Sequence, residues 1–124
     1  MKAMALNQLQ QLEENANPLQ LTTLPNPIPA DDEILIRVSA CGVCHTELDE
    51  IEGRMLPPHL PMVLGHQVVG RVAQLGRNAK RFRIGERVGV AWIFSACGTC
   101  KFCRAGNENL CDDFRATGRD ANGG

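Results

Sequence analysis

The sequence predicts a mainly β domain, folded as a small, partly open barrel with few short helices and a protruding four-cysteine lobe. One segment alternates apolar and polar residues with the period of a strand. Two later segments are rich in β-branched residues and contain isolated glycines, as bent strands do. Four of the six cysteines crowd into residues 97–111. Short strands punctuated by glycine and proline are typical of small barrels and open sheets.

The length and the charge of the chain limit the classes of protein to which it could belong. The 124 residues suffice for one domain of ordinary size. With 13 basic and 14 acidic residues, the formal net charge of -1 gives no reason to expect a nucleic-acid or membrane partner. The N-terminus lacks the apolar core of a secretion signal, and no apolar stretch approaches the roughly 20 residues that span a bilayer. We expect a cytoplasmic protein.

The first strand is predicted over residues 33–40, EILIRVSA. Its period of two places Ile34, Ile36 and Val38 on one face, which we expect to be buried. Alternating prolines in the preceding LPNPIPADD remove backbone donors and predict an extended connection.

Further strands are predicted over residues 68–76 and 87–93, with a polar turn between them. A short helix is expected around residues 44–52, ending at Gly53, where a left-handed cap residue is favoured. The chain contains no strand followed by a Gly-x-Gly-x-x-Gly turn, so it offers no evident place for a dinucleotide.

The cysteine-rich segment predicts a structural zinc site with four thiolate ligands. Its spacing is C-x2-C-x2-C-x7-C, made by Cys97, Cys100, Cys103 and Cys111. Four thiolates close a tetrahedral shell and leave no position for substrate, so the metal would stabilise the fold. An iron–sulfur cluster, free or disulfide-bonded thiols, and a zinc-ribbon module are the alternatives.

Two shorter motifs complete the pattern: CGVCHTEL at residues 41–48 and LGHQVVG at residues 64–70. Each is weak alone, because a Cys-His pair in a small domain is more often structural than functional. Together with Gly85–Gly89 and the four-cysteine segment, in this order, they resemble the zinc-dependent medium-chain alcohol dehydrogenases. The resemblance covers almost the whole chain and implies a GroES-like domain.

The resemblance also implies roles for single residues. Cys44 and His66 would be the thiolate and imidazole ligands of a catalytic zinc. Thr46 would hydrogen-bond the alcohol oxygen and start the path by which its proton leaves. His45 matches a position that contacts the cofactor pyrophosphate, or it faces solvent. Trp92 matches a position that lines the substrate pocket, or it packs in the core.

Several positions depart from the family pattern. Gln67 stands where relatives have glutamate after the histidine ligand, which weakens any role of that side chain toward a cation. Glu47 replaces the usual aspartate, and its extra methylene is expected to displace the bond that orients His66. Arg119 stands where an aromatic is common, and Cys41 is expected to be an unligated small side chain.

The resemblance therefore implies an N-terminal alcohol dehydrogenase domain over residues 1–124, with its zinc lobe at about 95–113. The third ligand of the catalytic zinc and the NAD or NADP domain fall outside this layout. Structural zinc is then expected to bind more tightly than catalytic zinc, because catalytic zinc generally has three protein ligands.

In a complete enzyme, the implied reaction is NAD(P)-linked oxidation of a small alcohol to an aldehyde or ketone, and oligomers are possible. The chain alone is expected to be inactive. One rival is a non-catalytic, zinc-stabilised truncated protein or interaction domain. The other is a related dehydrogenase acting on polyols or formaldehyde.

Overall fold

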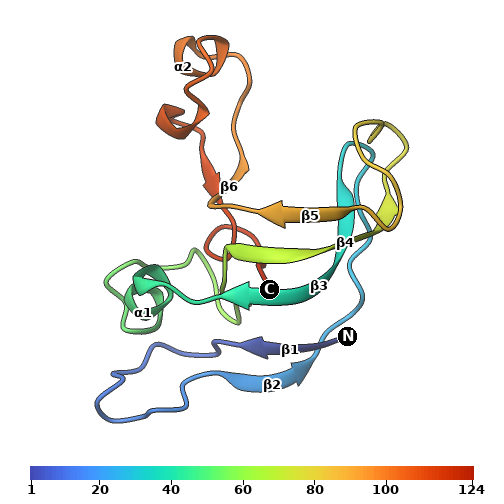
Figure 1. The fold of residues 1–124 in the computed structure, drawn as a ribbon. Helices are drawn as coiled ribbons and strands as arrows, with labels where there is room; N and C mark the ends of the chain where they lie inside the picture. Colours follow the sequence, from blue (N-terminus) through green and yellow to red (C-terminus); the bar gives the residue numbers. More distant parts are fainter.

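The computed structural model describes all residues, 1–124, and is built from three small antiparallel sheets (Figure 1). The first sheet pairs β1 (Lys2–Ala5) with β2 (Gln20–Thr23). The central sheet has the order β3 (Ile34–Gly42), β4 (Gln67–Leu75), β5 (Arg87–Val90). The third sheet pairs β6 (Ile93–Ser95) with β7 (Arg115–Ala116). The helices are α1 (His45–Ile51), α2 (Lys101–Arg104) and the 3-10 helix η1 (Glu108–Leu110). The mainly β, open-sheet fold is confirmed.

Two of the predicted strands are confirmed, as β3 and β4. The third prediction, a single strand over 87–93, is wrong. It divides at Ala91 and Trp92 into β5, which pairs with β4, and β6, which pairs with β7. In Figure 1 the chain turns between β5 and β6 toward the lobe that carries α2. Continuous β propensity could not show this, because the two halves find different partners.

The prediction of a buried face on β3 is wrong at its centre. Val38 is 46% exposed, whereas Ile34 and Ile36 are half-buried. The pairing of β3 with β4 shifts register between Leu35 and Ile36 and again between Val38 and Ala40. The register is unbroken from Ile36 to Val38, so Val38 shares the face of Ile36, but it lies opposite Gly70, which has no side chain to cover it.

The predicted helix is confirmed as α1, and the glycine expected after its C-terminal end is confirmed too. Cys44 is the N-cap, and Glu47 completes a capping box with it. Glu52 is the C-cap, and Gly53 follows at φ 79°, the left-handed conformation that favours glycine. The helix is thereby fixed directly behind Cys44. The short helices α2 and η1 in the cysteine lobe were not predicted.

The apolar core is small and joins the N-terminal sheet to α1. Leu6, Ile51, Met62 and Leu64 form it. Backbone bonds between Leu6 and Met62, at 2.8 and 3.0 Å, hold the first sheet against the segment before β4. Only 18 of 124 residues are buried, so hydrophobic burial alone provides limited stability. No helix has the length and apolar character required to cross a bilayer.

The C-terminal segment packs against the residues that lead into His66. The Val63 backbone donates to Asn122 Oδ1 at 2.9 Å and accepts from the Gly123 amide at 2.8 Å. Gly65 adopts φ 107°, and a Cβ at Gly123 would lie 1.8 Å from its carbonyl oxygen. This close backbone approach requires glycine and fixes the start of β4.

Candidate metal centres

The structure brings Cys44 and His66 together from positions 22 residues apart. Cys44 comes from the N-cap of α1, and His66 comes from the residue before β4. The Cys44 Sγ lies 3.4 Å from His66 Nε2. Thiolate and imidazole are the donors that zinc favours, and both atoms face the same point.

Glu47 lies behind this pair. Its Oε1 lies 2.8 Å from His66 Nδ1, although the ring N–H is not aligned for a standard hydrogen bond. Its Oε2 accepts from the Cys44 backbone N–H at 2.7 Å. Both side chains are buried, with exposed fractions of 9% for His66 and 5% for Glu47. The longer side chain still reaches the ring, but the hydrogen bond is displaced from standard geometry, because neither Glu47 Oε1 nor His66 Nδ1 has a hydrogen-bond partner.

The donor atoms of Cys44, Glu47 and His66 all lie within 4.8 Å of one another. Because Glu47 approaches Nδ1 while Cys44 approaches Nε2, the carboxylate is placed to hold the imidazole ring and keep Nε2 available. These residues fit a zinc ion at the sulfur and Nε2.

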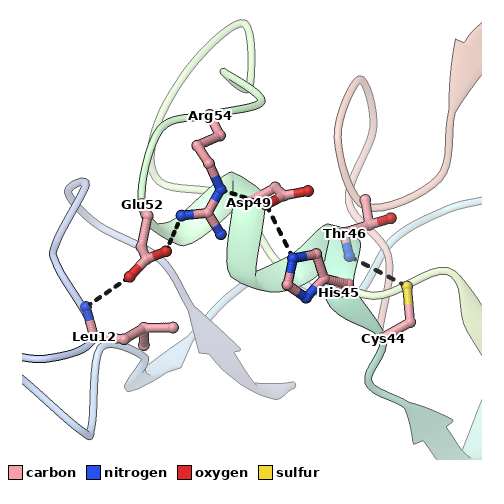
Figure 2. Close-up of polar contacts among 7 residues, drawn as sticks. All are labelled: Leu12, Cys44, His45, Thr46, Asp49, Glu52 and Arg54. Atoms are coloured by element: carbon pink, nitrogen blue, oxygen red, sulfur yellow. Dashed lines mark hydrogen bonds and ion pairs between the residues drawn. The ribbon is translucent and has the colours of Figure 1, made fainter.

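The next residues of α1 differ in their surroundings (Figure 2). The Thr46 backbone N–H donates to Cys44 Sγ at 3.4 Å, and the threonine is half-buried. The His45 side chain is 79% exposed, and its Nε2 lies 3.7 Å from Asp49 Oδ1. Thr46 is therefore next to the sulfur, whereas His45 points away into solvent.

Trp92 lies against the histidine of the site. Its ring centroid is 4.8 Å from that of His66 at 78°, an edge-to-face arrangement. Both residues line an open hollow of about 480 Å³, together with Gln67, Val69, Gly89 and other residues of β4 and β5. The Arg119 guanidinium lies 5.7 Å from the Trp92 centroid on another side and pairs with Asp120. Trp92 thus borders both the hollow and the metal site.

The second centre is the four-cysteine lobe, which stands away from the sheets around α2 (Figure 1). The sulfurs of its cysteines, Cys97, Cys100, Cys103 and Cys111, all lie within 4.8 Å of one another. Backbone N–H groups point at them: Cys100 N lies 3.3 Å from Cys97 Sγ, and Cys103 N lies 3.5 Å from Cys100 Sγ. These donors stabilise thiolates and preform the cluster.

The pKa values of these thiols show why the cluster suits a cation. The backbone N–H groups of Thr99 and Cys100 lower the pKa of Cys97 to about 6. Burial raises the pKa of Cys103 to about 12. Adjacent sulfurs cannot all be ionised without a compensating charge, which a divalent metal supplies. All six cysteines are free thiols, and Cys97 and Cys103 have their sulfurs 3.9 Å apart, far beyond bonding distance.

One charged residue near the site was missed. Glu50 is 0% exposed, and neither carboxylate oxygen has a hydrogen-bond partner. Burial, followed by the nearby charge of Glu47, raises its pKa to about 7. Its position three residues after Glu47 on α1 was the available signal, because residues at that spacing share a helix face.

Cys41 and Gln67, the other two positions considered in the sequence, lie near the site without joining a sulfur group. Cys41 lies outside both sulfur groups, and its thiol donates to the Gly42 carbonyl at 3.5 Å. Gln67 is exposed and lies over Gly42, where an added Cβ would meet its Oε1 at 2.7 Å.

The comparisons with known proteins decide the family. The alcohol dehydrogenase GroES-like domain family matches residues 30–124. The chain belongs to this family. A Mycobacterium tuberculosis protein named "Probable alcohol dehydrogenase AdhA" is 47% identical over 116 residues, covering 89% of this chain and 33% of that protein.

Two solved structures share the fold of this chain. The crystal structure of AibC is 33% identical in sequence, with a TM-score of 0.88. The match covers 100% of this chain and 34% of AibC. A cobalt- and zinc-bound alcohol dehydrogenase from Pyrobaculum aerophilum is 27% identical with a TM-score of 0.88, over 100% of this chain and 36% of that one. The chain spans about a third of the length of the curated relatives it matches.

Proposed function

We propose that this chain provides the metal-binding and alcohol-binding part of a zinc-dependent alcohol dehydrogenase, which acts together with a domain that holds NAD or NADP. The observation that carries the proposal is the convergence of Cys44 Sγ and His66 Nε2 at 3.4 Å beside the hollow bordered by Trp92. The four-cysteine lobe stabilises the fold and has no open position for substrate.

A zinc ion held at this site would act as a Lewis acid that makes an alcohol proton easier to lose. Cys44 and His66 would hold that ion, and Glu47 would fix the ring of His66 through Nδ1. His66 lines the hollow, so a small alcohol or aldehyde entering it would lie beside these donor atoms.

Thr46 is the residue we propose for proton transfer. Its backbone amide donates to Cys44 Sγ, which fixes the residue beside the metal donors. Its hydroxyl would accept the proton of an alcohol and donate its own onward, and a nicotinamide bound to the other domain would supply the hydride acceptor.

His45 and Trp92 are proposed as the groups that position cofactor and substrate. His45 is exposed on the side of α1 away from the core, free to meet a cofactor phosphate on a neighbouring domain. Trp92 presents its ring beside His66, where a large flat side chain limits the size of the alcohol.

A chimaera tests the proposed function. The chain replaces the matching third of its Mycobacterium tuberculosis relative, to which it is 47% identical over 116 residues. We expect zinc-dependent reduction of NAD or NADP with small alcohols. Thr46→Ala and His66→Ala should each lower kcat/KM by about a hundredfold or more, whereas Cys41→Ser, which removes a thiol outside both metal groups, should leave it unchanged.

A folded chimaera with full four-cysteine zinc but no alcohol-dependent activity would refute this function. It would favour the rival function, a zinc-stabilised domain that does not catalyse. Screening polyols and formaldehyde adducts alongside simple alcohols identifies the substrate class.

A further inference from the structure

Three arginines form a row across the central sheet. The register pairs Arg37 of β3 with Arg71 of β4, and Arg71 with Arg87 of β5. Residues directly opposite each other in antiparallel strands project their side chains from the same face. All three arginines are exposed. The row of Arg37, Arg71 and Arg87, called here the arginine row, is therefore a line of like charges on one face.

The arginine row has no acidic partner. The side chains of Arg37 and Arg87 make no hydrogen bond or ion pair, and Arg71 donates only to the Gly85 carbonyl, at 2.8 Å. The nearby Glu86 carboxylate accepts instead from the Arg83 backbone. Like charges placed directly opposite destabilise a sheet. A bound anion would offset that repulsion.

The neighbouring row of residues on the same face has small side chains and is exposed. It consists of Ala40, Val69 and Gly89, paired in register in the same order across the strands. Val69 is 39% exposed, and a Cβ added at Gly89 would meet nothing closer than a backbone oxygen at 3.6 Å. Val69 and Gly89 also line the hollow of about 480 Å³. An extended ligand thus has a shallow floor beside the three cations.

The arginine row is separate from the two metal centres. Arg71 lies four residues along β4 from Gln67, a distance of roughly 13 Å in a strand. In Figure 1, α1 and the loop between β4 and β5 lie at opposite ends of the central sheet. His66 and Trp92 line the same hollow as Val69 and Gly89, whereas none of the three arginines lines it.

We propose that the arginine row binds a chain of adjacent phosphates. Two strand spacings separate the outer arginines by roughly 10 Å, which suits two or three linked phosphates better than a single ion. The planar guanidinium group binds phosphate oxygens in pairs, and three of them match the multiple charges of such a chain. The phosphates belong either to a free oligophosphate or to a nucleotide, whose base would lie on the floor of Ala40, Val69 and Gly89.

Titration of the zinc-loaded chain with inorganic triphosphate, followed by amide NMR shifts, tests the proposal. We expect saturable shifts in β3, β4 and β5. Arg71→Ala should weaken binding about tenfold or more, since hydrogen bonds to charged groups contribute on the order of 1.5–3 kcal/mol. Affinity should fall as salt rises.

The matched control is Arg77→Ala, which removes the same charge from an exposed arginine already paired with Asp31 at 3.6 Å. Triphosphate can chelate zinc equally in the unchanged chain, Arg71→Ala and Arg77→Ala. A difference in triphosphate affinity between them therefore reports binding at the arginine row. A second titration with ATP separates the sources: tighter binding with shifts at Val69 and Gly89 indicates a nucleotide, and equal binding indicates the phosphate chain alone. Absence of saturable shifts at millimolar triphosphate, or equal weakening by both variants, would overturn the proposal.

Discussion

His66 Nδ1 lies 2.8 Å from Glu47 Oε1, and the other oxygen of the same carboxylate accepts from the Cys44 backbone at 2.7 Å. One buried side chain thus contacts both residues that present metal donors. Its capping role in α1 and its contact with the imidazole are inseparable, because both depend on the same carboxylate orientation.

We therefore expect Glu47→Gln to weaken metal binding at Cys44 and His66. The loss should be about 10- to 100-fold, the usual effect of removing a group that orients a ligating histidine. Cobalt(II) titration with a competing chelator measures it through the thiolate absorption. Asp49→Asn is the control, because that carboxylate contacts His45 and Arg54 instead. Equal affinity of Glu47→Gln and the unchanged protein would contradict the assigned role.

The two metal centres should differ in how tightly they hold zinc. After dialysis against a weak chelator, we expect about one zinc per chain, because four thiolates close a shell and Cys44 with His66 supply only two donors. Cys100→Ser should abolish the retained zinc and lower the thermal midpoint, whereas Cys41→Ser should do neither. Elemental analysis and thermal unfolding measure both quantities. Two tightly held zincs in the unchanged chain would be inconsistent with this expectation.

Glu50 should make stability depend on pH. Burial raises its folded-state pKa from 4.5 to about 7, so the folded chain holds this proton more tightly than the unfolded chain does. Its contribution is fully present below pH 4.5 and is lost as the pH rises through about 7. The surrounding charges are Glu47, Asp49, Arg119 and Asp120.

Glu50→Gln should therefore stabilise the chain at pH 8.5 by about 2 kcal/mol and have little effect at pH 5. Urea unfolding of the zinc-loaded proteins across that range gives the comparison, and zinc ligation affects both proteins alike. Parallel stability curves for the two proteins would show that Glu50 does not titrate as assigned.

Gly65 should tolerate no side chain. Its φ is 107°, and a Cβ would lie 2.6 Å from Cys41 Sγ. We expect Gly65→Ala to lower the free energy of unfolding by about 3 kcal/mol, since both the backbone and the packing oppose it. The control is Gly85→Ala, at φ 81° with nothing within 4 Å, which should cost only about 1 kcal/mol. Denaturant unfolding compares them, and equal losses would show that φ alone matters.

The sequence by itself determined which residues are candidate metal ligands and three of the elements, β3, β4 and α1. The cysteine spacing and the left-handed glycine at Gly53 are local features, and local rules carry them directly into structure. The strands β3 and β4 were predictable for the same reason. Their residues favour the extended conformation, and the two segments pair with each other in the folded chain.

Only the tertiary structure decided how those pieces meet. The division of 87–93 follows from two different pairing partners, and Val38 is left exposed opposite Gly70, a neighbour that only the strand register shows. The burial of Glu50 and the alignment of Arg37 with Arg71 depend on packing and register between distant segments. Such relationships arise from non-local contacts, which no periodicity within one segment encodes.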